Sequence, residues 1–129
     1  MLNNMNQHTN WLVISEHWCG DASQILPVIN SVAKASNGKI NLKIIYRDST
    51  ELINHHLTNG GKSIPILIQL DEQFNYQKEW GPRPKLAQKL ISELKNLELP
   101  LPEIIEKIHK WYADDKTIST QIELADLLK

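Results

Sequence analysis

The chain alternates short apolar runs with longer stretches of helical spacing, and this order restricts the possible folds more than any other feature. Trp11–Ser15 and Ile40–Tyr46 are compact β-favouring runs, and the apolar residues of Gly20–Ala35 between them recur at helical spacing. Pro65–Leu70 and Phe74–Trp80 are two further strands, separated by a hairpin-sized connection. Strands and helices in this order predict an α/β sandwich with a mixed, four-stranded sheet.

Helical patterns account for most of the remaining chain. A capping pair of acidic residues predicts a short helix over 48–57. The Gly-Pro-Arg-Pro segment 81–84 breaks the last strand and precedes another helix. After a linker at 99–102, two more amphipathic patterns begin near Ile104 and Ile118. We expect these last two helices to pack on the domain, because their apolar stripe is costly to leave in water.

The bulk properties limit the function classes. A length of 129 residues suits one domain, with a core at about 10–98 and a helical extension at about 102–128. The net charge of −1 gives no reason to expect nucleic acid or an anionic membrane as a partner. The N-terminal segment is polar, and a single cysteine cannot form an internal disulfide. We therefore expect a cytoplasmic protein that does not bind a membrane.

Three short motifs carry a family resemblance. Trp18-Cys19-Gly20-Asp21-Ala22 resembles the W-C-G-P-C signature of thioredoxins, and Pro27 lies where their active-site helix carries a proline. The segments N-G-G-K-S-I-P (59–65) and W-G-P-R-P (80–84) follow in the same order as in bacterial thioredoxin-like proteins with a W-C-G-D-A motif. The resemblance covers about residues 10–98. It implies a thioredoxin-like three-layer sandwich, with helices flanking the sheet and Pro65 in the cis form.

The chain departs from the thioredoxin pattern at two positions. Ala22 stands where the resolving cysteine would be, and Val13 takes the place of the buried aspartate that assists that cysteine. A dithiol–disulfide cycle within one copy of this chain is therefore chemically impossible.

The thioredoxin strand order would gather distant residues at one edge of the sheet. Both parallel strands end there, the third strand begins there and the fourth ends there. The gathered residues are His17, Trp18, Cys19, Asp21, Arg47, Ile64, Pro65 and Arg83. We predict Cys19 as the catalytic residue. The predicted substrate-binding residues are Trp18, Gly20, Asp21, Ile64, Pro65, Trp80 and Arg83.

Cys19 is the chemical centre of this prediction. A thiol at a helix N-terminus faces unpaired N–H groups and the positive end of the dipole, which lower its pKa below the usual value of ~8.5. Arg47, Arg83 or a protonated His17 would strengthen this effect, and the nearby carboxylates would oppose it. The alternative is that Cys19 is a small, half-buried apolar residue.

The other residues at this edge also have a structural alternative. Trp80 either walls the site or belongs to the partial core, and Arg83 is either an anion partner or a surface arginine. Ile64, beside a cis proline, would pair its backbone with an extended peptide. The adjacent His55 and His56 point apart on a helix and have no third ligand nearby, so no metal is expected.

These residues predict monothiol exchange without a cofactor. Cys19 would attack a protein or low-molecular-weight disulfide, and an external thiol would resolve the mixed disulfide. Two alternatives remain open. The first is a non-catalytic module that keeps the peptide groove of the fold, and the second is a thiol sensor oxidised at Cys19.

Overall fold

The structure is a computed structural model that describes residues 8–16, 20–49, 54 and 63–129. Four strands form one sheet: β1 (Thr9–Ser15), β2 (Ile40–Tyr46), β3 (Ile66–Leu70) and β4 (Tyr76–Trp80). Their spatial order is β2-β1-β3-β4, with β1 parallel to β2 and antiparallel to β3, and β3 antiparallel to β4. The predicted mixed, four-stranded sheet is confirmed.

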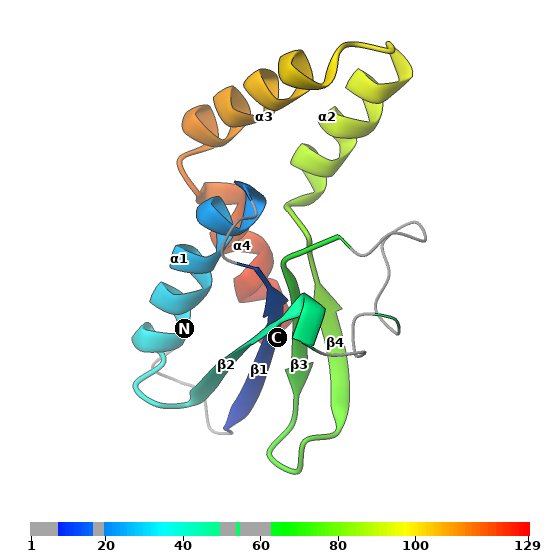
Figure 1. The fold of residues 1–129 in the computed structure, drawn as a ribbon. Coiled ribbons are helices and arrows are strands. Elements are labelled where there is room, and N and C mark those ends of the chain that lie inside the picture. The colour runs from blue at the N-terminus through cyan, green and yellow to red at the C-terminus, as the bar shows by residue number, and fades with distance from the viewer. Residues whose placement is uncertain (1–7, 17–19, 50–53, 55–62) are drawn as a thin grey trace.

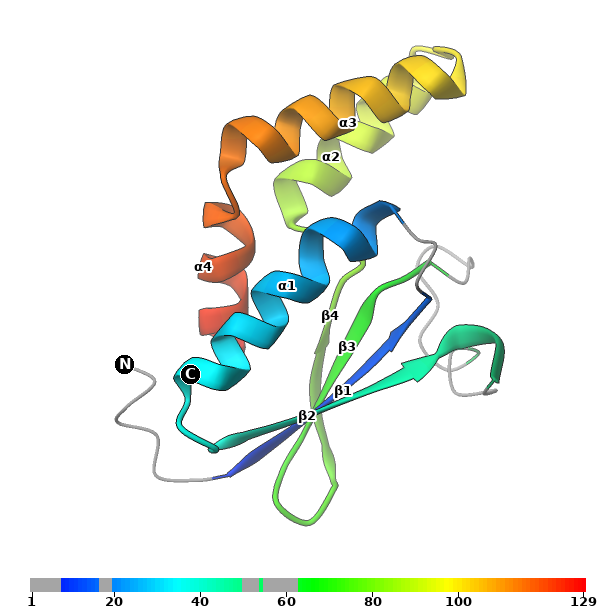
Figure 2. The same ribbon diagram turned by 60° about the vertical axis from the view of Figure 1, so that its left-hand side comes forward.

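Four α-helices accompany the sheet: α1 (Gly20–Ala35), α2 (Lys85–Asn96), α3 (Leu101–Asp115) and α4 (Ile118–Leu127). α1 and α4 lie over the same face of the sheet (Figure 2). α2 leaves the end of β4 and α3 returns beside it, so that these two helices project beyond the sheet edge where α1 begins (Figure 1). The expected helical extension is therefore present, and its last helix, α4, packs back onto the sheet.

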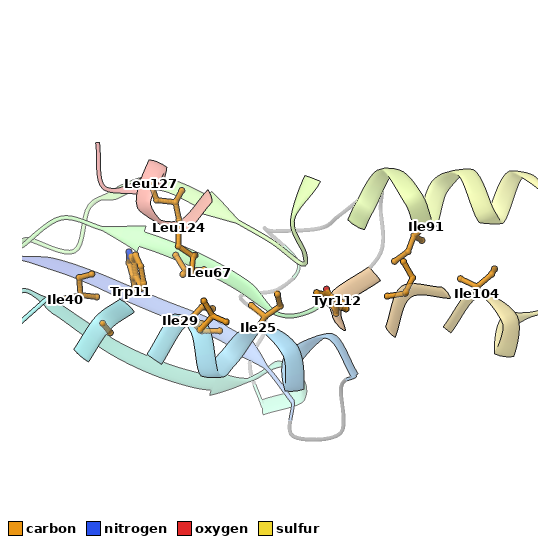
Figure 3. Packing of buried hydrophobic residues seen from close by; sticks show 14 of the residues in the cluster. Trp11, Ile25, Ile29, Ile40, Leu67, Ile91, Ile104, Tyr112, Leu124 and Leu127 are labelled. Carbon is orange, nitrogen blue, oxygen red and sulfur yellow. The ribbon is translucent and has the colours of Figure 1, made fainter. Parts of the chain in front are cut away.

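Buried apolar residues occupy both faces of the sheet. On the face of α1 and α4, Trp11 and Leu67 pack against Ile25, Ile29 and Leu124 (Figure 3). The same cluster continues between α2 and α3, with Ile91 on α2 and Ile104 on α3 (Figure 3). A second cluster contains Ile14, Ile64, Ile66 and Ile68, each at most 4% exposed. Burial on both faces is what the predicted three-layer sandwich requires.

The start of β4 differs from the sequence expectation. β4 begins at Tyr76, because Phe74 adopts a left-handed φ of 65° and its N–H donates to the carbonyl of Asp71. The Asp71 carboxylate also accepts the backbone N–H groups of Gln73 and Asn75, which completes a tight turn in place of the first strand residues. After β2 the chain forms a 3-10 turn at Arg47–Ser49, and most of the helix predicted over 48–57 lies outside the described residues.

The connection between α3 and α4 uses two consecutive left-handed residues, Lys116 (φ 52°) and Thr117 (φ 66°). Asp115 supports the turn by accepting both the backbone N–H and the hydroxyl of Ser119. The reversal aims α4 at the sheet, where Leu124 is fully buried. Deeper still, the buried Gln69 side chain donates to the carbonyl of Leu127 at 2.9 Å. The end of α4 is thus bound to a buried residue of β3.

Candidate functional site

The topology gathers the predicted edge. Ser15 is opposite Tyr46, Ile14 is opposite Ile66, and Leu67 is opposite Trp80, so the ends of all four strands meet where α1 begins (Figure 1). The predicted catalytic Cys19, with Trp18 and His17, lies outside the described residues. Gly20, also predicted, is the first residue of α1. The helix therefore starts directly after the thiol position in the sequence.

Two proline loops meet at this edge. The Ile64–Pro65 peptide bond is cis, as the family resemblance implies, and both residues are buried. The Gly81–Pro82 bond is also cis, which sequence reasoning missed because it treated 81–84 only as a strand terminator. Gly81 has a φ of +121°, and a Cβ placed on it would overlap the carbonyl oxygen of Pro65. The two loops therefore touch backbone to backbone.

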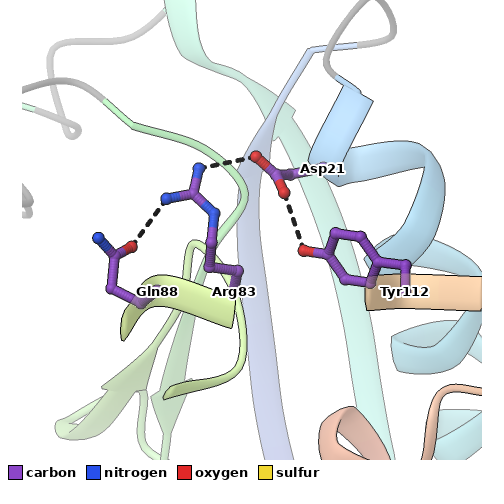
Figure 4. Close-up of polar contacts among 4 residues, drawn as sticks. All are labelled: Asp21, Arg83, Gln88 and Tyr112. Atoms are coloured by element: carbon purple, nitrogen blue, oxygen red, sulfur yellow. Dashed lines mark hydrogen bonds and ion pairs between the residues drawn. The ribbon is translucent and has the colours of Figure 1, made fainter. Parts of the chain in front are cut away.

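Asp21, Arg83, Gln88 and Tyr112 form one polar cluster, which we name the Asp21 cluster (Figure 4). Arg83 Nη2 donates to Asp21 Oδ2 at 2.7 Å, and Tyr112 Oη donates to Asp21 Oδ1 at 2.8 Å. Arg83 Nη1 donates to Gln88 Oε1, also at 2.7 Å. The cluster joins the first turn of α1 to the loop before α2 and to the far end of α3.

Burial makes the Asp21 cluster more than a surface ion pair. The Arg83 and Asp21 side chains are only 14% and 19% exposed, and Arg83 Nε is buried without a hydrogen-bond partner. An ion pair at this depth loses solvation that its attraction only partly returns, so its net stabilisation is small. Removing one partner alone would leave a poorly solvated charge. Asp21 and Arg83 were both predicted to contact substrate, and in the structure they contact each other.

Trp80 faces the helical extension. Its indole packs at the border of the main core, and its Nε1 donates to Glu123 Oε1 of α4 at 2.9 Å. The Glu123 carboxylate also accepts the N–H of Lys85 at the start of α2. Trp80 was expected either to wall the site or to belong to the partial core, and these contacts are those of a partial-core residue.

Glu16 is a buried carboxylate that sequence reasoning considered only as a charge near the thiol. Its side chain lies at the end of β1 and is 7% exposed, and Oε1 accepts the backbone N–H of Asp48 at 3.0 Å. The bond fastens the turn after β2 to the end of β1, 32 residues away in sequence. Arg47, from the same turn, pairs with its neighbour Asp48 through Nε at 3.0 Å. The signal available in the sequence was an acidic residue directly after an apolar strand.

The described residues contain neither a candidate metal site nor a membrane-spanning helix. Within residues 8–16, 20–49, 54 and 63–129, no group of three or more His, Cys, Asp or Glu side chains could hold a metal ion. In the same part of the chain, no helix has the length and apolar content needed to cross a bilayer.

Comparison with known proteins identifies the fold. A family model described as thioredoxin matches residues 1–95. A protein of unknown function from Pseudomonas aeruginosa has a similar structure (TM-score 0.67, 21% identity), with 98% of this chain and 67% of that chain covered. An HIV epitope scaffold is similar over the same shares of the two chains (TM-score 0.66, 23% identity). A comparison with curated proteins found no match.

Proposed function

Because this chain belongs to the thioredoxin family, we propose that it carries out thiol–disulfide exchange through one thiol, that of Cys19. The observation that supports this proposal best is the start of α1 at Gly20, directly after the only cysteine of the sequence. A helix N-terminus favours the thiolate, which is the nucleophile in disulfide exchange.

The proposed reaction has two steps. The Cys19 thiolate attacks one sulfur of a protein or low-molecular-weight disulfide, forms a new S–S bond and releases the other sulfur as a thiolate. A low-molecular-weight thiol then attacks the mixed disulfide as its thiolate, which forms a second disulfide product and regenerates Cys19. The external thiol is necessary because Ala22 occupies the resolving position and is 2% exposed. Such thiols are plentiful in the reducing cytoplasm, where we place the protein.

The proposed substrate site extends from Trp18 and Gly20 to the Ile64–Pro65 loop. The loop precedes β3 at the edge where α1 begins, and we propose that an extended peptide lies beside it. The other predicted substrate-binding residues have partners within the protein: Asp21 pairs with Arg83, and Trp80 donates to Glu123. We also propose that the W-C-G-D-A motif marks a bacterial single-cysteine branch of the family.

The test traps the mixed disulfide in a single turnover and measures the intact mass of the protein. Wild-type protein mixed with a disulfide-bonded peptide should gain the mass of one half-peptide and lose it when a small thiol is added. Cys19→Ser should gain nothing. Ala22→Cys should lose two hydrogens on mild oxidation, because the two positions lie three residues apart at the start of one helix. A wild-type chain that never forms the adduct, although its thiol reacts with alkylating reagents, would favour the non-catalytic binding module instead.

A further inference from the structure

The two outer strands of the sheet differ in how they discourage the addition of a further strand. Within residues 8–16, 20–49, 54 and 63–129, β2 and β4 each pair with a strand on one side only (Figure 1). The register between β4 and β3 shifts between Gln69 and Leu70, and the exposed residues of β4 include a lysine and a glutamate. Such a bulge and such charges protect an edge strand from pairing with another chain. β2 instead pairs with β1 over seven residues without interruption and carries one charged residue, Lys43.

β2 also exposes large hydrophobic side chains. Ile44 is 50% exposed and Tyr46 is 55% exposed. Ile44 lies opposite Val13, a fully buried residue of the main core, so the Ile44 side chain is on the face of the sheet that α1 covers. Leu42 and Tyr46 are on the same face, because alternate residues of a strand share a face. The exposed side chains of this edge strand therefore lie on one face of the sheet.

The hydrogen bonds between β1 and β2 show which backbone groups of β2 point away from the sheet. The Thr9 N–H donates to the Lys39 carbonyl at 2.8 Å, and Thr9 is opposite Ile40. In a parallel ladder this pattern repeats every second residue, so the odd-numbered residues of β2 direct their N–H and C=O groups at β1. The even-numbered residues, which include Leu42 and Ile44, direct these groups outward. An added strand would bond to the even-numbered residues.

Charge and exposure exclude most ways of pairing two copies of β2. In an antiparallel pair related by a two-fold axis, outward groups meet only where even-numbered residues lie opposite each other. An axis at Lys43 places two ammonium groups opposite each other, and an axis at Ile45 places Lys43 opposite Arg47. Both arrangements are destabilised by like charges. An axis at Leu42 leaves the exposed Tyr46 beyond the paired residues, because β2 begins at Ile40 on the other copy.

An axis at Ile44 meets all of these conditions. The two Ile44 residues exchange N–H···O bonds in both directions and bring their exposed side chains together. Leu42 lies opposite the partner's Tyr46, whose carbonyl has two lone pairs for the Leu42 N–H. Lys43 lies opposite the partner's Ile45 and faces no like charge.

We infer that β2 is a homodimerisation edge. Two copies of this chain pair their β2 strands antiparallel about a two-fold axis at Ile44, and their four-stranded sheets join into one continuous sheet. The partner that this edge fits is thus a second copy of the chain. The inference does not depend on the proposed thiol chemistry.

The first test is sedimentation equilibrium of the full chain under reducing conditions, over about a hundredfold range of concentration. The wild type should change from monomer mass to dimer mass, with a modest affinity because one strand pair is a small interface. Ile44→Lys should raise the dissociation constant at least about tenfold, since two ammonium groups would meet at the axis. Ile122→Lys is the matched control, because Ile122 is 58% exposed on α4, and it should dimerise as the wild type does.

Three results would overturn the inference. A wild type that is monomeric at every concentration would leave the β2 edge to a strand of another protein. An unchanged dissociation constant in Ile44→Lys would place the dimer contact elsewhere. An equal loss of dimer in Ile122→Lys would do the same.

The second test measures the register by disulfide cross-linking in a Cys19→Ser background. Ile44→Cys should form a linked dimer when diamide oxidises the two thiols, because hydrogen-bonded antiparallel pairs place their Cα atoms about 5.5 Å apart, within reach of a disulfide. Lys43→Cys should not link, since its two copies lie two residues out of register. Ile122→Cys measures linkage by random collision. A Lys43→Cys dimer that forms faster than the Ile44→Cys dimer overturns the axis at Ile44, and equal rates for Ile44→Cys and Ile122→Cys overturn the pairing of β2.

Discussion

Among the contacts between the helical extension and the thioredoxin domain, two have opposite character. One is the Asp21 cluster, which contains an ion pair between mostly buried side chains. The other, which we name the core anchor, consists of Leu124, Leu127 and the hydrogen bond from Gln69 to the Leu127 carbonyl. The core anchor is neutral, and Leu124 is fully buried in it.

This contrast separates stability from positioning. At the core anchor, the stabilisation of the fold grows in proportion to the apolar area that is removed from water. The ion pair of the Asp21 cluster gives little net stability, because desolvation offsets most of its attraction. A tail fastened by the core anchor alone would remain attached, but its α3 end would not fix the first turn of α1.

The largest effect is expected from removing both attachments. Truncation after Pro100 deletes α3 and α4 and exposes the partners of Leu124, Ile104 and Ile108. We expect a loss of roughly 5 kcal/mol or more, comparable with the whole stability of a small domain. Thermal unfolding followed by circular dichroism, with size-exclusion chromatography, measures it. A monodisperse product with an unchanged melting temperature would show that the extension serves a separate partner.

Breaking the core anchor alone is the next step. Leu124→Ala should lower the free energy of unfolding by about 2–5 kcal/mol, since it leaves a cavity at a fully buried site. Ile122→Ala, two residues away and 58% exposed, is the control and should change it by less than about 0.5 kcal/mol. Urea unfolding of both variants gives the comparison. Equal losses in the two variants would mean that α4 is not held through Leu124.

The polar part of the core anchor should be weaker but clear. Gln69 accepts from the Trp11 indole and donates to Gln77 and to the Leu127 carbonyl, all within 3.1 Å. Gln69→Leu leaves the buried indole N–H and the carbonyl without their partner, which should cost about 2–3 kcal/mol. Gln77→Leu removes a single bond at an exposed residue and should cost under about 1 kcal/mol. A neutral Gln69→Leu would reduce the core anchor to its apolar contacts.

The smallest effect is expected at the Asp21 cluster. Tyr112→Phe removes one hydroxyl and leaves the buried ring, so the free energy of unfolding should fall by only about 0.5–1.5 kcal/mol. In the Asp21→Asn background the same change should cost less, because the hydroxyl no longer meets a charged acceptor. Denaturant unfolding of the four proteins completes this cycle. Additive losses would separate Tyr112 from Asp21 and remove the basis for a positioning role.

Much of the fold was predictable from local patterns. The runs Trp11–Ser15 and Ile40–Tyr46 became β1 and β2 within two residues, because both consist mainly of apolar residues that favour strands. Asn37 and Gly38, with φ of 56° and 84°, close α1 through a turn that such residues favour. Phe74 was misassigned to a strand, because its aromatic ring suggested β structure while the Asp71 turn fixed its backbone.

The candidate site was predictable in its membership and not in its contacts. Arg83 and Asp21 were expected at the same edge, since the strand order puts them there, but nothing local shows that they pair with each other. Tyr112 belongs to the amphipathic pattern that begins near Ile104, and its hydroxyl partner is 91 residues away. Trp80 had two equal interpretations until Glu123 of α4 was placed beside it. The contacts of Tyr112 and Trp80 depend on where the extension docks, and a single sequence does not encode this in any short pattern.

Gly81 has a consequence for the substitutions this chain tolerates. Any side chain there would collide with the Pro65 carbonyl, and the φ of +121° excludes most residues even without the collision. A saturation mutagenesis screen should therefore find Gly81, a partly exposed loop residue, as intolerant as the fully buried Leu67. The loop before β3 and the loop after β4 are held together by the close backbone contact between Pro65 and Gly81. The length of one loop therefore cannot change independently of the other. An insertion on one side would have to be matched on the other for the chain to keep the edge at which α1 begins.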